Sequence, residues 1–167
     1  KRLRDPLNYM QMMQIEEKYP NVKLIIAHLG RAYADEDLGD TLEIMKDSKT
    51  TIWDFTANTN AYVMQKVLEK FGTERLVFGS DLPIFRMKAK RIVENGFYIN
   101  VIPKGSLGDV SIDPHMREAH GEEARLISFF LYEEILACRK ACETLGLGKQ
   151  DVENIFFKNS AKLFGVN

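Results

Sequence analysis

Three short apolar segments recur along the first half of the chain at the spacing of βα units. Residues 22–27 are rich in β-branched side chains and lack polar alternation, which is typical of a strand buried on both faces of a parallel sheet. Residues 50–56 and 75–78 also have the composition of strands. The strand centres lie roughly 25 residues apart, the length of one βα unit. The pattern therefore predicts an α/β fold built on a parallel sheet or barrel.

Helical segments are predicted between these strands and after them. Asp5 and Pro6 have the pattern of an N-cap followed by the first helical residue. Beyond Asp81 the βα rhythm stops. The expected elements are helices over 6–18, 40–46 and 61–71, a strand over 97–102, a loop over 103–121, a long helix over 122–145, and helical turns over 151–157 and 160–164. We expect one domain over residues 1–167, with a loop-rich insertion over 84–121.

Composition excludes several classes of function. The net charge of −1 gives no overall basic field for nucleic acid or an anionic membrane. No segment approaches the roughly 20 apolar residues that a membrane-spanning helix needs. Cys138 and Cys142 lie four residues apart on one side of a predicted helix, where small core residues are expected in preference to a disulfide. A reduced, cytoplasmic location is therefore expected.

Two residues that directly follow predicted strands are candidates for an active site. The carboxyl ends of barrel strands are where such folds place metal ligands and proton-transfer groups. His28 could bind a metal or take a proton from water, or it could be a core histidine bonded to a backbone carbonyl. Asp81 would be costly at a buried strand edge unless paired or metal-bound, with a helix N-cap as the alternative. Asp54, within a predicted strand, could line the site, but we favour hydrogen bonds that hold a loop.

Other polar residues give weaker signals. His115 and His120 are five residues apart, which separates them by roughly 140° around a helix and does not fit the zinc-peptidase spacings. They are not expected to bind a metal. Arg31 and Arg86 each follow a candidate residue closely. They could bind a substrate carboxylate, or form surface ion pairs.

Three segments together resemble a known family. Residues 19–30, Tyr-Pro-Asn-Val-Lys-Leu-Ile-Ile-Ala-His-Leu-Gly, resemble the sixth-strand segment of the amidohydrolase-related (amidohydrolase 2) family of metal-dependent hydrolases. Residues 75–83, Arg-Leu-Val-Phe-Gly-Ser-Asp-Leu-Pro, are similar to its eighth-strand motif, and residues 159–165 to its C-terminal helix. The resemblance covers residues 5–83 and 151–167. Residues 84–149 look like a long, less typical insertion.

The resemblance implies a (β/α)8 barrel with a divalent metal, usually zinc, at the carboxyl ends of its strands. Asp81 would be the eighth-strand metal ligand that also handles the proton of the nucleophilic water. His28 would be the sixth-strand histidine, which binds a second metal or orients or deprotonates water. The first-strand His-x-His pair and the fifth-strand histidine are absent. The expected fold is therefore a partial TIM barrel: C-terminal strands six to eight with their helices, plus a long helical C-terminal segment.

The function implied by the resemblance is hydrolysis of a small carbonyl-type substrate by metal-activated water. The isolated chain is expected to be inactive, because its metal site would be incomplete. One alternative is a metal-dependent decarboxylase or other lyase of the same family. Another is a non-catalytic α/β interaction module, because an open three-stranded sheet leaves two unpaired edges. We accordingly expect a homo-oligomer, or association with the missing part of the barrel, and no nucleic-acid or membrane partner.

Overall fold

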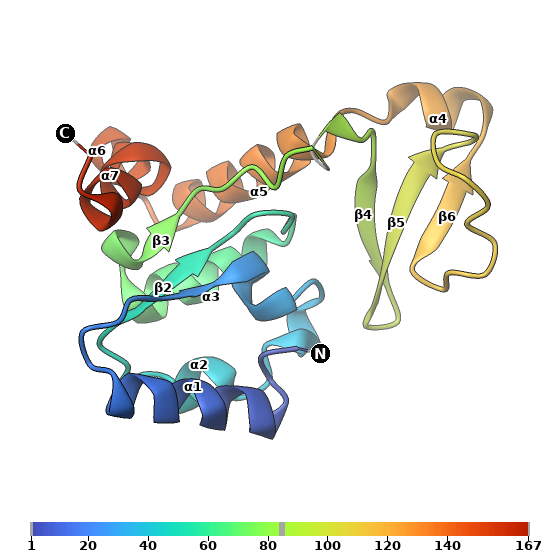
Figure 1. Ribbon diagram of the computed structural model, residues 1–167. Helices are drawn as coiled ribbons and strands as arrows, with labels where there is room; N and C mark the ends of the chain where they lie inside the picture. Colours follow the sequence, from blue (N-terminus) through green and yellow to red (C-terminus); the bar gives the residue numbers. More distant parts are fainter. Residues whose placement is uncertain (1, 84–85, 167) are drawn as a thin grey trace.

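The computed structural model describes residues 2–83 and 86–166 and shows an α/β fold with two separate sheets (Figure 1). The first sheet is parallel, and its strand order is the order along the chain. It consists of β1 (Leu24–Ile26), β2 (Thr51–Asp54) and β3 (Leu76–Val77). These strands confirm the three predicted βα strands, although each is shorter than the apolar segment that predicted it.

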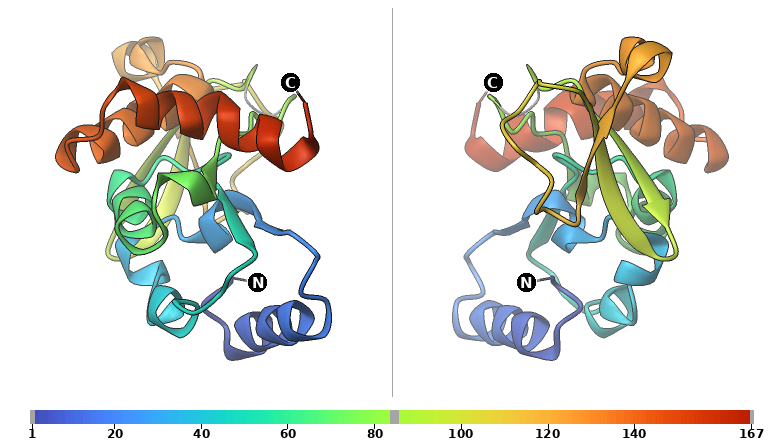
Figure 2. Two further views of the ribbon diagram at one scale, coloured as in Figure 1. Left: turned by 90° about the vertical axis from the view of Figure 1, so that its left-hand side faces the viewer. Right: turned by 90° about the vertical axis from the view of Figure 1, so that its right-hand side faces the viewer.

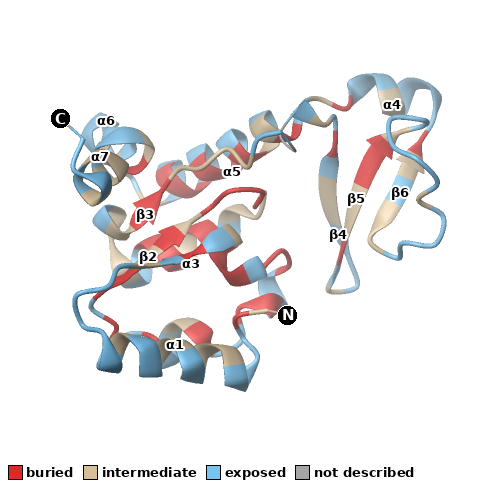
Figure 3. Cartoon of the chain, in the orientation of Figure 1, coloured by how far each residue is buried: buried red, intermediate tan, exposed pale blue. Residues whose placement is uncertain are grey.

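Helices bury one side of the parallel sheet. They are α1 (Pro6–Lys18), α2 (Thr41–Ile44), α3 (Ala61–Phe71) and α5 (Phe130–Thr144). The main core joins β2 and β3 to α3, α5 and the C-terminal segment, around the fully buried Trp53 and Phe55 (Figure 3). The α3 helix begins where the side chain of Asn60 accepts a hydrogen bond from the Val63 N–H, and it ends at Gly72 with a φ of 79°. The prediction for α3 is confirmed.

The second sheet projects beyond one end of α5 (Figures 1 and 2). It consists of β4 (Lys90–Glu94), β5 (Phe97–Pro103) and β6 (Met116–Ala119), with β4 antiparallel and β6 parallel to β5. The strand expected over 97–102 is confirmed as β5. The expectation of a loop throughout 103–121 is wrong, because β6 lies within it, and β4 was not predicted. Both of these strands are rich in charged residues, so their apolar pattern is weak.

The long helix expected over 122–145 is interrupted. The structure has α4 (Gly121–Leu126), three extended residues, and then α5. The interruption comes from pairing with a remote segment: Ala89 N–H donates to Ser128 O at 3.2 Å, and Phe130 N–H donates to Met87 O at 3.0 Å. Backbone pairing across the chain thus overrides the local helical preference of residues 127–129.

The C-terminal segment closes over β3. It runs through α6 (Lys149–Glu153), a wide π-helical turn (Asn154–Lys158) and α7 (Asn159–Phe164). The Asn159 amide donates to Thr73 O at 2.7 Å and to Leu76 O at 2.8 Å, which joins α7 to the start of β3. Cys138 and Cys142 are free and buried, as predicted. Among the described residues, no helix is both long and apolar enough to cross a bilayer.

Candidate active site

The carboxyl ends of β1, β2 and β3 form one edge of the parallel sheet, and the candidate residues follow directly after them. His28 lies two residues beyond β1, the turn of residues 56–58 follows β2, and Asp81 lies four residues beyond β3. Because neighbouring strands are about 4.8 Å apart, the outer strands β1 and β3 are separated by roughly 10 Å. The turn after β2 therefore lies between the two candidate residues.

The backbone takes the left-handed conformation at all three strand ends. His28, Leu29, Gly30 and Arg31 form a run of four positive φ angles, from 50° to 68°. Ala57 has a φ of 52°, and Asp81 one of 46°. For residues other than glycine this conformation costs about 1 kcal/mol or more each, and such strain concentrates at functional sites. The strained positions thus mark the same edge as the candidate side chains.

His28 is half-buried and its ring is fixed by the turn after β2. Its Nδ1 lies 2.8 Å from Thr56 O. A carbonyl oxygen only accepts, so Nδ1 carries the proton, and Nε2 of the neutral ring keeps a free lone pair. This bond was expected for a core histidine, and it is also the bond that orients metal-binding imidazoles. The Asn58 amide donates to Ala32 O at 2.7 Å and to His28 O at 3.3 Å, which ties the two strand ends together.

Asp54 and Asp81 both lie near this edge, but only Asp54 is hydrogen-bonded to a described residue. Asp54 accepts a hydrogen bond from the Thr56 N–H at 2.5 Å, so the expectation that it holds a loop is confirmed. Asp81 is partly exposed, caps no helix of the described chain, and has no hydrogen bond or ion pair with any described residue. Between them, Gly79 allows a close approach, since a Cβ there would collide with Thr56 Oγ1. The Asp81 carboxylate thus has no partner among the described residues.

A third carboxyl group reaches the same turn from a remote helix. Glu134, on α5, is fully buried, and its Oε2 accepts from the Ala57 N–H at 3.0 Å. Its Oε1 is buried with no partner among the described residues. Burial, together with the nearby charges of Asp54 and Asp81, raises the pKa of Glu134 to about 9, although the hydrogen bond from the Ala57 N–H acts in the opposite direction. Glu134 is therefore protonated at neutral pH and faces the candidate site.

Sequence reasoning missed Glu134, although one signal was present. On α5 it shares a face with the buried residues Phe130, Ala137, Cys138 and Ala141. A carboxyl group within such an apolar stripe is costly unless it has a role.

The other residues singled out in the sequence lie on the surface or against the second sheet. Arg31 and Arg86 are both exposed, and neither forms an ion pair within the described part of the chain. Arg31 is next to the His28 turn, whereas Arg86 lies beyond Asp81, where its N–H donates to Pro83 O. The His115 ring stacks on Tyr98 with centroids 3.9 Å apart, in the second sheet. His120 is exposed at the start of α4.

The donor types at the strand ends suit a divalent metal, but their number does not complete a site. Zinc takes imidazole nitrogen and carboxylate oxygen, and His28 Nε2 and the Asp81 carboxylate are donors of these two types. Over residues 2–83 and 86–166, however, no three such side chains come close enough together to hold an ion. The donors of the described residues therefore do not form a metal site by themselves.

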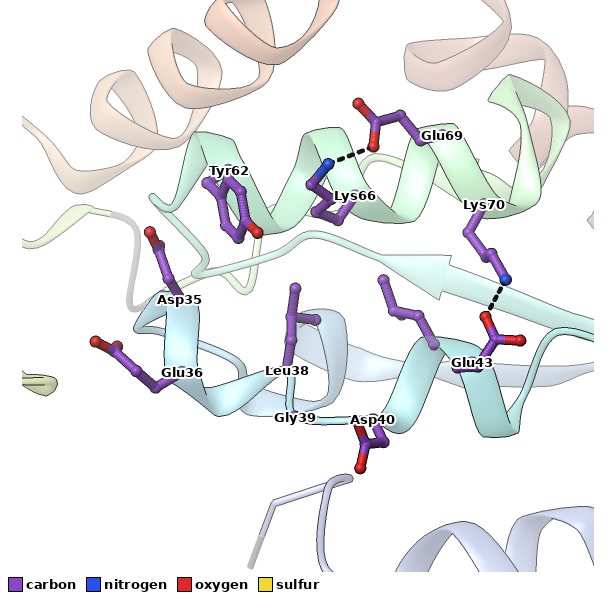
Figure 4. Close-up of a pocket in the computed structure, with 11 residues that line it drawn as sticks. Asp35, Glu36, Leu38, Gly39, Asp40, Glu43, Tyr62, Lys66, Glu69 and Lys70 are labelled. Carbon is purple, nitrogen blue, oxygen red and sulfur yellow. Dashed lines mark hydrogen bonds and ion pairs between the residues drawn. The ribbon is translucent and has the colours of Figure 1, made fainter.

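A separate groove of about 540 Å³ lies on the helical side of the parallel sheet (Figure 4). Residues of α2, of α3 and of the 35–40 segment line it. Its lysines are already paired: Lys66 Nζ lies 2.7 Å from Glu69, and Lys70 Nζ lies 2.5 Å from Glu43. The groove contains none of the candidate residues, so the strand-end edge remains the candidate active site.

Comparison with known proteins gives one result. A family model described as "Amidohydrolase" matches residues 4–166. The match runs through residues 84–149, so this segment, which looked like an insertion, lies inside the family region. No curated protein and no solved structure matches the chain.

Proposed function

The chain belongs to the amidohydrolase family, and we propose that it carries the His28–Asp81 part of a metal-dependent hydrolase site. The proposed substrate is a small molecule with a carbonyl-type group that is attacked by water. The observation that carries the proposal is the location of two potential ligands at one sheet edge: His28 Nε2, with its ring fixed through Nδ1, and the Asp81 carboxylate, which has no partner among the described residues. Both also lie at strained backbone positions.

Zinc is the proposed metal, held by His28 Nε2, Asp81 and ligands beyond those described. When bound, it lowers the pKa of a coordinated water toward 7 and polarises the substrate carbonyl. With zinc in place, Asp81 would accept a proton from the attacking water, and His28 would orient the water or the substrate. The hydrogen bond from His28 to Thr56 O keeps the imidazole in the tautomer that this role requires.

We propose that β1, β2 and β3 are strands six to eight of a (β/α)8 barrel, within one domain that includes the second sheet. Their parallel order, and the collection of polar side chains at their carboxyl ends, support this assignment. The free thiols of Cys138 and Cys142 are consistent with the proposed cytoplasmic location.

A lyase of the same family is the alternative reaction. The exposed Arg31, which lies close to His28 and has no ion pair with a described residue, favours this reaction, because a decarboxylase must hold the carboxylate that it removes. Release of carbon dioxide distinguishes this reaction from hydrolysis.

A zinc titration followed by NMR tests the metal proposal on the chain itself. The chain has three histidines, so substitution can assign each ring resonance. We expect zinc to shift the His28 ring at lower concentration than the His115 and His120 rings. We also expect the binding to be weak, because the shell is incomplete. Absence of a selective His28 shift would contradict the proposal, and tight one-to-one binding by a monomer would contradict the partial shell.

We also propose that the outer edge of β1 is an association surface, for a second copy or for the rest of a barrel. The edge has no partner strand among the described residues, and Ile25 on it is 43% exposed. We expect light scattering to show dimers or larger assemblies whose mass falls on dilution. A clean monomer at high concentration, unchanged in an Ile25→Lys variant, would argue against this surface.

A further inference from the structure

Arg91 links the second sheet to the candidate active site. It lies on β4, and its side chain extends to the turn after β2, where Nη1 donates to Ala57 O at 2.5 Å. Its Nε donates to Asn100 Oδ1 at 2.8 Å, which fixes the guanidinium plane. The neighbouring carbonyl, Thr56 O, is the one that holds the His28 ring. The guanidinium and the imidazole are therefore attached to consecutive peptide groups of one turn.

The surroundings of Arg91 are aromatic and contain no counter-charge. Its guanidinium carbon lies 4.0 Å from the ring centroid of Tyr33, 4.9 Å from Phe130 and 5.2 Å from Tyr98. Loss of solvent lowers the pKa of Arg91 to about 10. No described carboxylate forms an ion pair with it, and Nη2 has no hydrogen-bond acceptor among the described residues. A guanidinium fixed in this way and lacking an anionic partner is suited to an anionic ligand.

Arg31, which forms no ion pair with a described residue, lies two residues before Tyr33, the ring on which Arg91 stacks. The charge of Arg31 is near enough to contribute to lowering the pKa of Arg91. Tyr33 reports the same proximity: burial raises its pKa, the charges of Arg91 and Arg31 lower it, and the charge of Asp81 raises it.

We propose that Arg91, together with Arg31, binds the carboxylate of a small organic-acid substrate beside His28 and Asp81. The inference rests on the proposed function, for which it names the substrate class. Arg91 Nη2 donates to one carboxylate oxygen, and Arg31 approaches the other. The second sheet then has a role in specificity, because it contributes the fixed arginine.

Binding to the metal-free chain tests this inference separately from the zinc proposal. In the presence of a chelator, benzoate and benzamide are titrated into the chain and followed by NMR. The two probes have nearly the same shape but differ in charge. We expect benzoate to bind about tenfold more tightly than benzamide, which corresponds to one charge-assisted hydrogen-bonded contact. The zinc titration of His28 is a different readout, so each proposal can fail alone.

Three variants test whether Arg91 and Arg31 cause the preference for benzoate. Arg91→Lys keeps the charge but loses the planar geometry, and Arg31→Gln removes a side chain that makes no hydrogen bond or ion pair with any described residue. Each is expected to weaken benzoate binding about tenfold and to leave benzamide binding unchanged. Lys90→Gln, an exposed neighbour on the opposite face of β4, is the matched control and should bind benzoate as the unmodified chain does.

Two results would overturn the inference. One is equal affinity of the unmodified chain for benzoate and benzamide. The other is unchanged benzoate affinity in Arg31→Gln, which decides the question even if Arg91→Lys fails to fold because Arg91 also anchors the second sheet at Ala57.

Discussion

Asp81→Asn is expected to weaken zinc binding at His28 about a hundredfold while leaving the fold intact. Asparagine preserves the size of the side chain but replaces an anionic oxygen donor by a neutral one, and zinc binds anionic and imidazole donors in preference. Stability should change little, because Asp81 has no hydrogen bond or ion pair among the described residues. The measurement is the zinc dependence of the His28 ring resonance, together with thermal unfolding of both forms.

Asp47→Asn is the matched control for this prediction. Asp47 is an exposed aspartate that precedes β2, so it lies at the opposite edge of the same sheet. It should bind zinc at His28 as the unmodified chain does. In an assembled, active enzyme, Asp81→Asn should also lower kcat about 10³-fold, the usual scale for loss of a proton-transfer group. Zinc affinity that is equal in Asp81→Asn and in the unmodified chain would remove Asp81 from the proposed ligands.

The positions of His28 and Asp81 could be predicted because their signal is local. Each follows a short apolar segment, and the carboxyl ends of parallel strands share one sheet edge. The contact between His28 and Thr56 could not be predicted in this way. It depends on the left-handed backbone at residues 28–31, which only one glycine in that run suggests.

Glu134 and Arg91 were missed because their roles depend on residues far away in the sequence. Glu134 bonds to Ala57 across 77 residues, and Arg91 bonds to the same residue across 34. Neither spacing corresponds to a local motif. Their meeting point, Ala57, is itself inconspicuous in the sequence, although it is strained in the structure.

The second sheet was only partly predicted, and one overlooked signal explains much of the error. Asn95-Gly96 joins β4 to β5, and both residues have positive φ angles of 54° and 73°. Asn-Gly is the strongest short hairpin signal, because this type of turn requires positive φ at both central residues. Recognition of it would have predicted β4. The interruption between α4 and α5 has no such signal, since it arises from pairing with residues 87–89.

Glu134→Gln is expected to stabilise the chelator-treated chain, by an amount that grows with pH. The folded chain holds the Glu134 carboxyl with a pKa of about 9, whereas the unfolded chain should titrate it near 4.3. Below pH 4 both states keep the proton, and this group adds no pH dependence. As the pH rises from 4.3 toward 9, the unfolded state releases the proton and the folded state keeps it, so stability falls.

The slope of this loss can reach about 1.4 kcal/mol per pH unit for a single group. The glutamine introduced by Glu134→Gln has no proton to release, so the variant should lack this contribution. The new amide oxygen can still accept from the Ala57 N–H, and the new NH₂ takes the place of Glu134 Oε1, which has no partner among the described residues, so no existing hydrogen bond is lost. The stability difference between the two forms should therefore grow by roughly 2–4 kcal/mol between pH 5 and pH 8.

Urea unfolding at several pH values measures this difference, and Glu133→Gln is its matched control. Glu133 is the adjacent carboxylate on α5, but it is partly exposed and has no partner among the described residues, so its variant should follow the unmodified chain at every pH. Parallel stability curves for Glu134→Gln and the unmodified chain would mean that Glu134 is ionised in the folded state. A buried anion with one unpartnered oxygen would then need a positive charge beside it, and a cation shared with Asp81 would be the first candidate.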